Sequence, residues 1–205
     1  MKKNILVIDL DRCIGCMGCQ VACKLENNVA LGTSRIRVLT IGPTGKFPDL
    51  QMYFLPVMCQ QCENPSCIKV CPTGASYRRE EDGDVLIDQE ICIGCQSCQN
   101  ACPYELNNFN NELRVMDKCT LCSHLEGTGE KPACVRNCAG RAMLFGDVND
   151  PASDVSIALA EAGQEHVFAL RDSGGHPAVR YILRHADWQD ILPQEHQEQQ
   201  GGRRR

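Results

Sequence analysis

The sequence predicts an α+β fold built from two cysteine-rich modules, the second inserted into the first, with a cysteine-free C-terminal extension. Three observations lead to this prediction. Sixteen of the 205 residues are cysteines, and they fall into four groups of four. Stretches around these groups resemble one another, which indicates an internal repeat. Aromatic residues form only 5% of the chain, so large aromatic side chains contribute little to the hydrophobic core. Only short helices and strands are expected.

The cysteine groups define the repeat and the module boundaries. In order, the groups are Cys13, Cys16, Cys19, Cys23; Cys59, Cys62, Cys67, Cys71; Cys92, Cys95, Cys98, Cys102; and Cys119, Cys122, Cys134, Cys138. Residues 9–24 align with 88–103 at nine of sixteen positions, and residues 65–75 resemble 132–142. We therefore expect an outer module at 1–48 and 110–150, an inserted module at 49–109, and a docking extension with a frayed tail at 151–205.

Short strands are predicted in the first half of the chain. Apolar and β-branched runs at residues 4–9, 35–41 and 52–57 predict three strands. Residues 42–45, Gly-Pro-Thr-Gly, predict the turn between the last two. An alternating segment after an acidic glycine turn predicts a hairpin over residues 76–88.

Short helices are predicted around the last two cysteines of each group. A gap of three residues places two side chains on neighbouring helical turns, which predicts helices at 19–26 and 98–102. Outside the cysteine groups, Pro151-Ala-Ser-Asp154 predicts the start of a helix over residues 154–162. Strands are expected at residues 166–170 and 178–183, and the polar end at 195–205 is expected to fray.

Three chemistries use this many cysteines: disulfides, zinc sites and iron–sulfur clusters. Disulfides need an oxidising compartment, and the four apolar residues after Asn4 are fewer than a secretion signal requires. Groups one and three share the spacing Cys-x2-Cys-x2-Cys-x3-Cys, with Gly15 and Gly94 where the backbone must approach inorganic sulfide. In two-cluster ferredoxins this spacing gives three ligands to one cluster and the fourth to its neighbour. The spacing therefore predicts ferredoxin-like dicluster modules.

The spacing of group four, taken alone, does not distinguish a zinc site from an iron–sulfur cluster. Its spacing, Cys-x2-Cys-x11-Cys-x3-Cys, also fits a structural zinc site, because such sites use two pairs of ligands separated by a loop. Its similarity to group two, Cys-x2-Cys-x4-Cys-x3-Cys-Pro, favours a cluster. A zinc-stabilised interaction module is the alternative interpretation.

We expect four [4Fe-4S] clusters with crossed ligands. Groups two and three are close in sequence and pair with each other, so groups one and four pair across the insertion. The expected sets are A, Cys13, Cys16, Cys19 and Cys138; B, Cys23, Cys119, Cys122 and Cys134; C, Cys59, Cys62, Cys67 and Cys102; and D, Cys71, Cys92, Cys95 and Cys98. This pairing predicts that the N-terminal strand meets residues 144–147.

The order and spacing of the groups resemble the iron–sulfur (beta) subunits of the molybdopterin oxidoreductases of the dimethyl sulfoxide reductase family. The resemblance covers about residues 5–148. It rests on Cys13-Ile-Gly-Cys-Met-Gly-Cys-Gln-Val-Ala-Cys-Lys24, Cys67-Ile-Lys-Val-Cys-Pro-Thr-Gly-Ala75, Cys92-Ile-Gly-Cys95 and Lys118-Cys-Thr-Leu-Cys122. One departure is Ala139, where the family often has proline.

The resemblance implies an electron-transfer subunit that is not an enzyme on its own. Its four clusters would connect a molybdenum or tungsten bis-pterin catalytic subunit with a quinone-linked membrane subunit or a soluble carrier. It also implies either a cytoplasmic complex or export of the folded subunit with a partner that bears a twin-arginine signal. The alternatives are the equivalent subunit of a hydrogenase and a free polyferredoxin.

Net charge and hydropathy argue against two kinds of interaction, nucleic-acid binding and a direct membrane span. The formal net charge of −5 argues against nucleic-acid binding, and no apolar run is long enough for a membrane helix. Cations near cysteines stabilise a reduced cluster, and Lys118 and Arg141 are the candidates for this tuning. Because little apolar core is expected without metal, the chain should unfold when the clusters are removed.

Overall fold

The two ends of the chain share one sheet. The computed structural model describes residues 2–190, 192 and 193. The sheet has the order β8-β1-β10-β9, and its strands are β1 (Asn4–Asp9), β8 (Met143–Asp147), β9 (Val167–Phe168) and β10 (Arg180–Ile182). The first five residues of β1 are buried, as expected for an apolar strand that pairs on both sides.

Strand β1 connects distant parts of the sequence. It runs antiparallel to β8, with Asn4 opposite Asp147 and Val7 opposite Leu144, and parallel to β10. The predicted meeting of the N-terminal strand with residues 144–147 is therefore confirmed.

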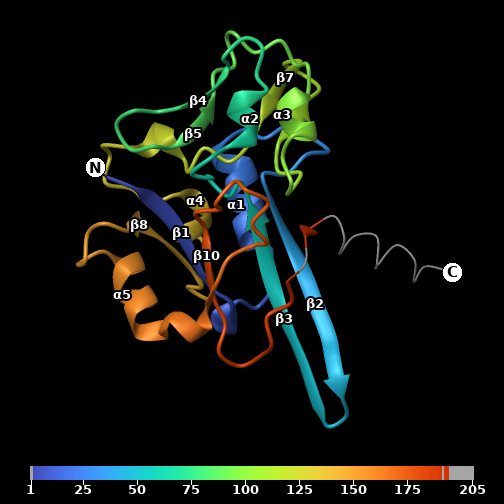
Figure 1. Ribbon diagram of the computed structural model, residues 1–205, viewed down its shortest axis with the longest axis vertical. Coiled ribbons are helices and arrows are strands. Elements are labelled where there is room, and N and C mark those ends of the chain that lie inside the picture. Colours follow the sequence, from blue (N-terminus) through green and yellow to red (C-terminus); the bar gives the residue numbers. More distant parts are fainter. Residues whose placement is uncertain (1, 191, 194–205) are drawn as a thin grey trace, which may run out of the picture.

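A long hairpin of β2 (Ile36–Lys46) and β3 (Asp49–Met58) extends away from the rest of the molecule (Figure 1). The predicted turn at residues 42–45 is wrong. The ladder is irregular between Ile41 and Thr44 but then resumes as far as Lys46 opposite Asp49. The glycine and proline of this segment cause only a local irregularity in the pairing of the two strands. The chain reverses at Phe47-Pro48 instead.

Two short hairpins belong to the cysteine-rich region in the upper part of Figure 1. The predicted one consists of β4 (Ser76–Arg78) and β5 (Val85–Ile87). The sequence did not predict the second, β6 (Asn108–Asn110) and β7 (Val115–Asp117). The asparagines and glutamate of this segment resemble a loop rather than a strand.

The helices are short and four of them carry cysteines. These four are α1 (Gly18–Glu26), α2 (Ser66–Lys69), α3 (Ser97–Asn100) and α4 (Ala133–Arg136). Helix α3 ends at Asn100, two residues before the predicted end. The fifth helix, α5 (Asp154–Ala162), has the predicted bounds, and its Ser153 caps it by accepting a hydrogen bond from the Ser156 amide at 3.2 Å. The 3₁₀ turns are η1 (Leu10–Arg12), η2 (Ser123–Leu125) and η3 (Gln164–His166).

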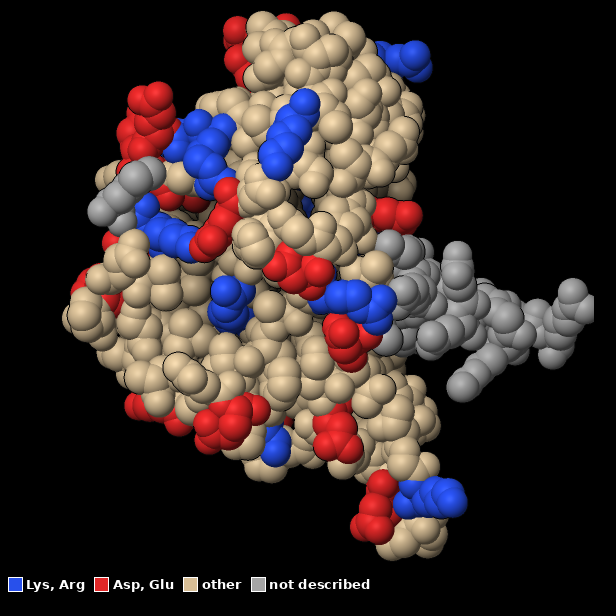
Figure 2. Space-filling model, in the orientation of Figure 1, with Lys and Arg blue, Asp and Glu red and all other residues tan. Residues whose placement is uncertain are grey.

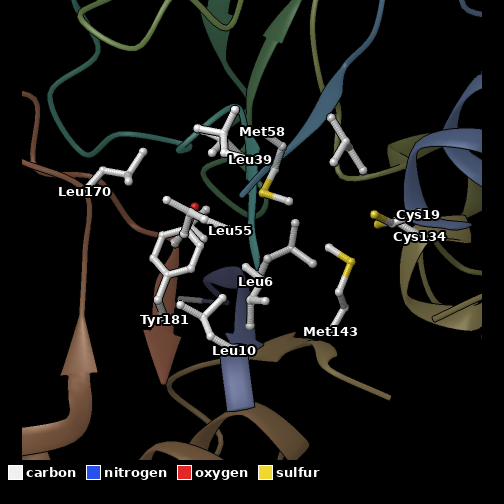
Figure 3. Packing of buried hydrophobic residues seen from close by; sticks show 14 of the residues in the cluster. Leu6, Leu10, Cys19, Leu39, Leu55, Met58, Cys134, Met143, Leu170 and Tyr181 are labelled. Atoms are coloured by element: carbon white, nitrogen blue, oxygen red, sulfur yellow. The ribbon is translucent and has the colours of Figure 1, made fainter. Parts of the chain in front are cut away.

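The main core lies between the sheet and the base of the hairpin. Figure 3 shows Leu6, Leu55 and Tyr181 pointing toward one another there. Trp188 packs over this core, with its ring centroid 5.1 Å from that of Phe168 and 5.6 Å from that of Tyr181. The described part of the C-terminal extension therefore builds the core as well as covering it.

The surface shown in Figure 2 carries acidic and basic side chains interspersed with one another. Within the described residues, no helix has the length and hydropathy to cross a membrane. Residues 195–205, for which fraying is predicted, lie outside the described residues.

Candidate metal centres

None of the sixteen cysteines, all of which lie among the described residues, forms a disulfide, and glycines shape two of the loops that carry them. Gly15 and Gly94 adopt φ angles of +65° and +67°. A Cβ atom on Gly94 would lie 2.3 Å from the carbonyl oxygen of Arg114, and one on Gly15 would lie 2.5 Å from the ring of Phe54. Both positions favour glycine, because the left-handed backbone strains any other residue and an added side chain would meet a close neighbour.

The first and fourth cysteine groups meet where α1 packs against α4. Burial, together with the nearby thiols of Cys13 and Cys138, raises the pKa of Cys19 to about 11. Burial also raises the pKa of Cys13, and the thiols of Cys138 and Cys16 add to this rise. Cys138 thus lies beside the first three thiols of group one.

The last thiol of group one lies with group four. Burial raises the pKa of Cys134 well above its ordinary value, and the thiols of Cys119, Cys122 and Cys23 raise it further. All four of these side chains are buried. At the edge of the core, Cys134 also neighbours Cys19 (Figure 3), so the two groups of thiols are adjacent.

The second and third groups are interleaved in the same way, where α2 packs against α3. Burial raises the pKa of Cys62 to about 12, with further contributions from Cys59, Cys102 and Cys67. Cys102, the last thiol of group three, therefore lies with the first three of group two.

The remaining four thiols form a group that includes one exposed cysteine. Burial raises the pKa of Cys98, and the thiols of Cys92, Cys71 and Cys95 raise it further. Cys95 is exposed, and the Ser97 hydroxyl lowers the pKa of its thiol. Cys71, the last thiol of group two, completes this group.

The donor chemistry of these four groups fits iron–sulfur clusters. A zinc ion draws its thiolates to about 2.3 Å from one point. Within the described residues, no three Cys, His, Asp or Glu side chains form a group that could hold a single metal ion. The thiols form four groups of four neighbours, the number of thiolate ligands that a [4Fe-4S] cluster takes. The raised pKa values of buried thiols such as Cys19, Cys62 and Cys134 mean that loading the clusters must release protons, because only thiolates ligate iron.

Several sulfurs also accept hydrogen bonds from the backbone. The three amide donors and their acceptors are Ser76 to Cys71 at 3.4 Å, Met116 to Cys92 at 3.4 Å, and Ala142 to Cys138 at 3.2 Å. Such bonds favour the charged thiolate over the thiol and help to set the potential of a cluster.

The two predicted tuning cations lie in different environments. Lys118 is 1% exposed, and its ammonium donates to the carbonyl oxygens of Val85 and Cys119. Its charge opposes the burial-driven rise in the pKa of both Cys67 and Cys119, so it lies between the second and fourth groups. Arg141 is exposed, and solvent screens its charge.

The sequence analysis missed three polar residues beside group four. Arg35 and Asp117 form a buried ion pair through two hydrogen bonds of 2.8 and 2.6 Å, and Asn27 points its amide at two cysteine sulfurs. Asn27 follows Cys23 by one helical turn, which is a local signal. Arg35 and Asp117 are far apart in sequence, so no local pattern joins them.

Comparison with known proteins identifies the family. Residues 50–148 match one family model of a 4Fe-4S dicluster domain, and residues 12–75 match a second with the same description. The chain is 41% identical to a Halobacterium salinarum protein named as an iron-sulfur subunit of dimethyl sulfoxide reductase, covering 86% of this chain and 78% of that protein. The chain belongs to the iron–sulfur (beta) subunits of the dimethyl sulfoxide reductase family.

Other relatives of this type are similarly close. A sulfite dehydrogenase subunit of Allochromatium vinosum is 39% identical over 95% of this chain and 89% of its own. The thiosulfate reductase electron transfer subunit of Salmonella typhi is 43% identical over 83% and 87%. As a member of this family, the chain is an electron-transfer subunit that holds four [4Fe-4S] clusters and is not catalytic on its own. The matched models cover every cysteine of group four, so the zinc alternative for that group is set aside.

Proposed function

We propose that the chain passes single electrons along one line of four clusters, in the order A, B, C, D. The observation that supports this order is the electrostatic interaction between thiols of neighbouring sets. The thiol of Cys19 in set A raises the pKa of Cys134 in set B, and the thiol of Cys59 in set C raises the pKa of Cys119 in set B. Sets C and D are linked in the same way, through Cys67 and Cys98.

Electrons enter and leave at sets A and D. Each of these sets has one exposed ligand, Cys16 in A and Cys95 in D. In contrast, all four ligands of set B are buried. A partner can therefore approach the outer clusters most closely, and the inner clusters serve as relays.

The two modules of this proposal are nested. Residues 1–48 and 110–150 supply sets A and B, and the inserted residues 49–109 supply sets C and D. The packing of α1 on α4 and of α2 on α3 supports this division. The boundary at residue 48 falls at the tip of the β2–β3 hairpin, so the two modules share this hairpin. Residues 151–190 return to the outer module through β9 and β10.

The partners we propose are a molybdenum or tungsten bis-pterin catalytic subunit at one end, and a quinone-linked membrane subunit or a soluble carrier at the other. Relatives named for dimethyl sulfoxide reductase, sulfite dehydrogenase and thiosulfate reductase support this choice. The complex would act in the cytoplasm or be exported as a folded assembly. Purifying the native complex without oxygen and measuring molybdenum, tungsten and pterin tests it; a complex lacking all three refutes it.

The crossed ligand sets can be tested with pairs of serine variants. Cys138→Ser and Cys13→Ser should alter the same electron paramagnetic resonance signal, because both thiols belong to set A. Cys23→Ser and Cys134→Ser should alter a different one, that of set B. If Cys138→Ser instead matches Cys134→Ser, each group holds its own cluster and the crossed pairing is wrong.

A further inference from the structure

The side-chain amide of Asn27 lies between two sulfurs that come from different cysteine groups. Its Nδ2 atom is 3.7 Å from Sγ of Cys23 and 3.6 Å from Sγ of Cys122. The same nitrogen is 3.1 Å from the carbonyl oxygen of Cys23, one helical turn back. The nitrogen has two hydrogens for these three acceptors, so at least one hydrogen is shared between two of them.

A buried ion pair fixes the direction of this amide. The guanidinium of Arg35 donates to Oδ1 of Asn27 at 2.8 Å. A guanidinium has donors only, so it must face the oxygen of the amide, and the nitrogen is left facing the sulfurs. Asp117 holds Arg35 with two hydrogen bonds of 2.8 and 2.6 Å. The side chains of this pair are only 9% and 8% exposed, so solvent competes little with these bonds.

We propose that Asn27 sets the reduction potential of cluster B by donating hydrogen bonds to two of its ligands, in an orientation imposed by Arg35 and Asp117. This proposal rests on ligand set B of the proposed function. Reduction of the bound cluster would add one electron from a neighbouring cluster without forming or breaking a covalent bond, and the ligand sulfurs would share the added negative charge. An N–H donor aimed at those sulfurs stabilises the reduced form and raises the potential.

Arg35 contributes in the same direction through its charge. Burial raises the pKa of Cys23 to about 11, and the positive charge of Arg35 is the first influence that opposes this rise. Asp117 opposes the effect of Arg35, since its negative charge raises the pKa of Cys23. Because the carboxylate offsets much of the charge of Arg35, the directed amide of Asn27 is left as the specific donor. At sets A and D, the sulfurs of Cys138, Cys71 and Cys92 accept hydrogen bonds from backbone amides, and the hydroxyls of Thr73 and Ser97 lie within hydrogen-bonding distance of Cys71 and Cys95.

The test compares Asn27→Leu with a matched control, Asn137→Leu. Asn137 ends α4, and its amide donates to the carbonyl of Ala133 one turn back at 2.9 Å, just as Asn27 does at the end of α1. Within the described residues its amide has no sulfur partner. Both variants lose the helix-end bond, whereas only Asn27→Leu loses the donor to the sulfurs and, with it, the oxygen that accepts from Arg35. Redox titration of each protein, followed by electron paramagnetic resonance, measures the potentials of the four clusters separately.

We expect the equilibrium constant for reducing one cluster to fall about tenfold in Asn27→Leu, from the loss of hydrogen bonds to charged groups. Tenfold corresponds to about 59 mV for one electron. That cluster must be the one altered by Cys134→Ser, and Asn137→Leu should leave it unchanged. Equal shifts in both variants, or no shift in Asn27→Leu, would overturn the proposal.

A measurement on the unsubstituted protein tests the proposal even if Asn27→Leu does not assemble its clusters. Protein labelled with ¹⁵N in its asparagine side-chain amides should show a nitrogen hyperfine coupling on the signal of reduced cluster B in pulsed electron paramagnetic resonance. The absence of this coupling refutes the proposed hydrogen bonds while leaving the electron relay intact. A shift of two clusters in Asn27→Leu would instead show that Cys23 and Cys122 serve different clusters, and would reject ligand set B itself.

Discussion

Replacing Gly94 by alanine should destabilise the loop of set D through two effects that the structure separates. The left-handed backbone, at φ +67°, costs an alanine roughly 1–2 kcal/mol. The new Cβ atom would also lie 2.3 Å from the carbonyl oxygen of Arg114, and relieving such overpacking costs typically about 1–3 kcal/mol. The expected loss is therefore about 2–5 kcal/mol for Gly94→Ala.

Gly74 provides the control for this prediction. It has a similar φ of +73°, but a Cβ atom there would meet nothing within 4 Å, so Gly74→Ala should lose only the roughly 1–2 kcal/mol of backbone strain. The assay is anaerobic thermal unfolding followed by the visible absorbance of the clusters, in which each kcal/mol lowers the midpoint by about 2–4 °C. Equal midpoints for the two variants would refute the role assigned to the contact with Arg114.

Three further predictions concern single side chains: the buried Lys118 and Asp84, and the half-buried Trp188. Lys118→Met should lower the potential of clusters B and C by on the order of 100 mV, the effect of one charge several ångström away at an effective dielectric of about 20, whereas Lys118→Arg should keep most of it; redox titration measures both. Burial and the nearby Asp82 raise the pKa of Asp84 from 3.8 to about 7. The folded carboxyl thus holds its proton more tightly than the unfolded one, so its contribution to stability falls as pH rises toward 7 and is constant above. The thermal midpoint of Asp84→Asn should therefore rise relative to that of the unsubstituted protein between about pH 4 and 7, the window between the unfolded and folded pKa values, and keep that gain to about pH 8; a difference between the two midpoints that does not change with pH contradicts this. Trp188→Ala should cost about 1–3 kcal/mol, because the half-buried ring stacks on Phe168 and lies tilted against Tyr181; an unchanged thermal midpoint would show that this packing contributes nothing.

Local spacing made the metal chemistry predictable from the sequence. The gaps between cysteines determine which thiols share a loop or a helix, so the groups could be identified without knowing the fold. The helix at Asp154–Ala162 and the hairpin at Ser76–Ile87 also carry local signals, in a serine cap and an acidic glycine turn. In contrast, Gly42 and Pro43 gave a turn signal that the pairing of β2 with β3 overrides.

Long-range features could not be predicted in the same way. Strand β10 pairs with β1 across most of the chain, so the extension, expected only to dock, contributes to the core. Arg35 and Asp117 meet through the fold, and neither is next to a cysteine. Adjacency in sequence made Lys118 and Arg141 look equivalent, yet one is buried between two groups of thiols and the other is exposed to solvent.

The most direct test of the four-cluster assignment is the iron, sulfide and zinc content of protein purified without oxygen. We predict about sixteen irons and about sixteen sulfides per chain, and no bound zinc. About twelve irons with one zinc would contradict it. Group four would then hold a structural zinc ion, and the line of clusters would be interrupted at B, with A separated from C and D.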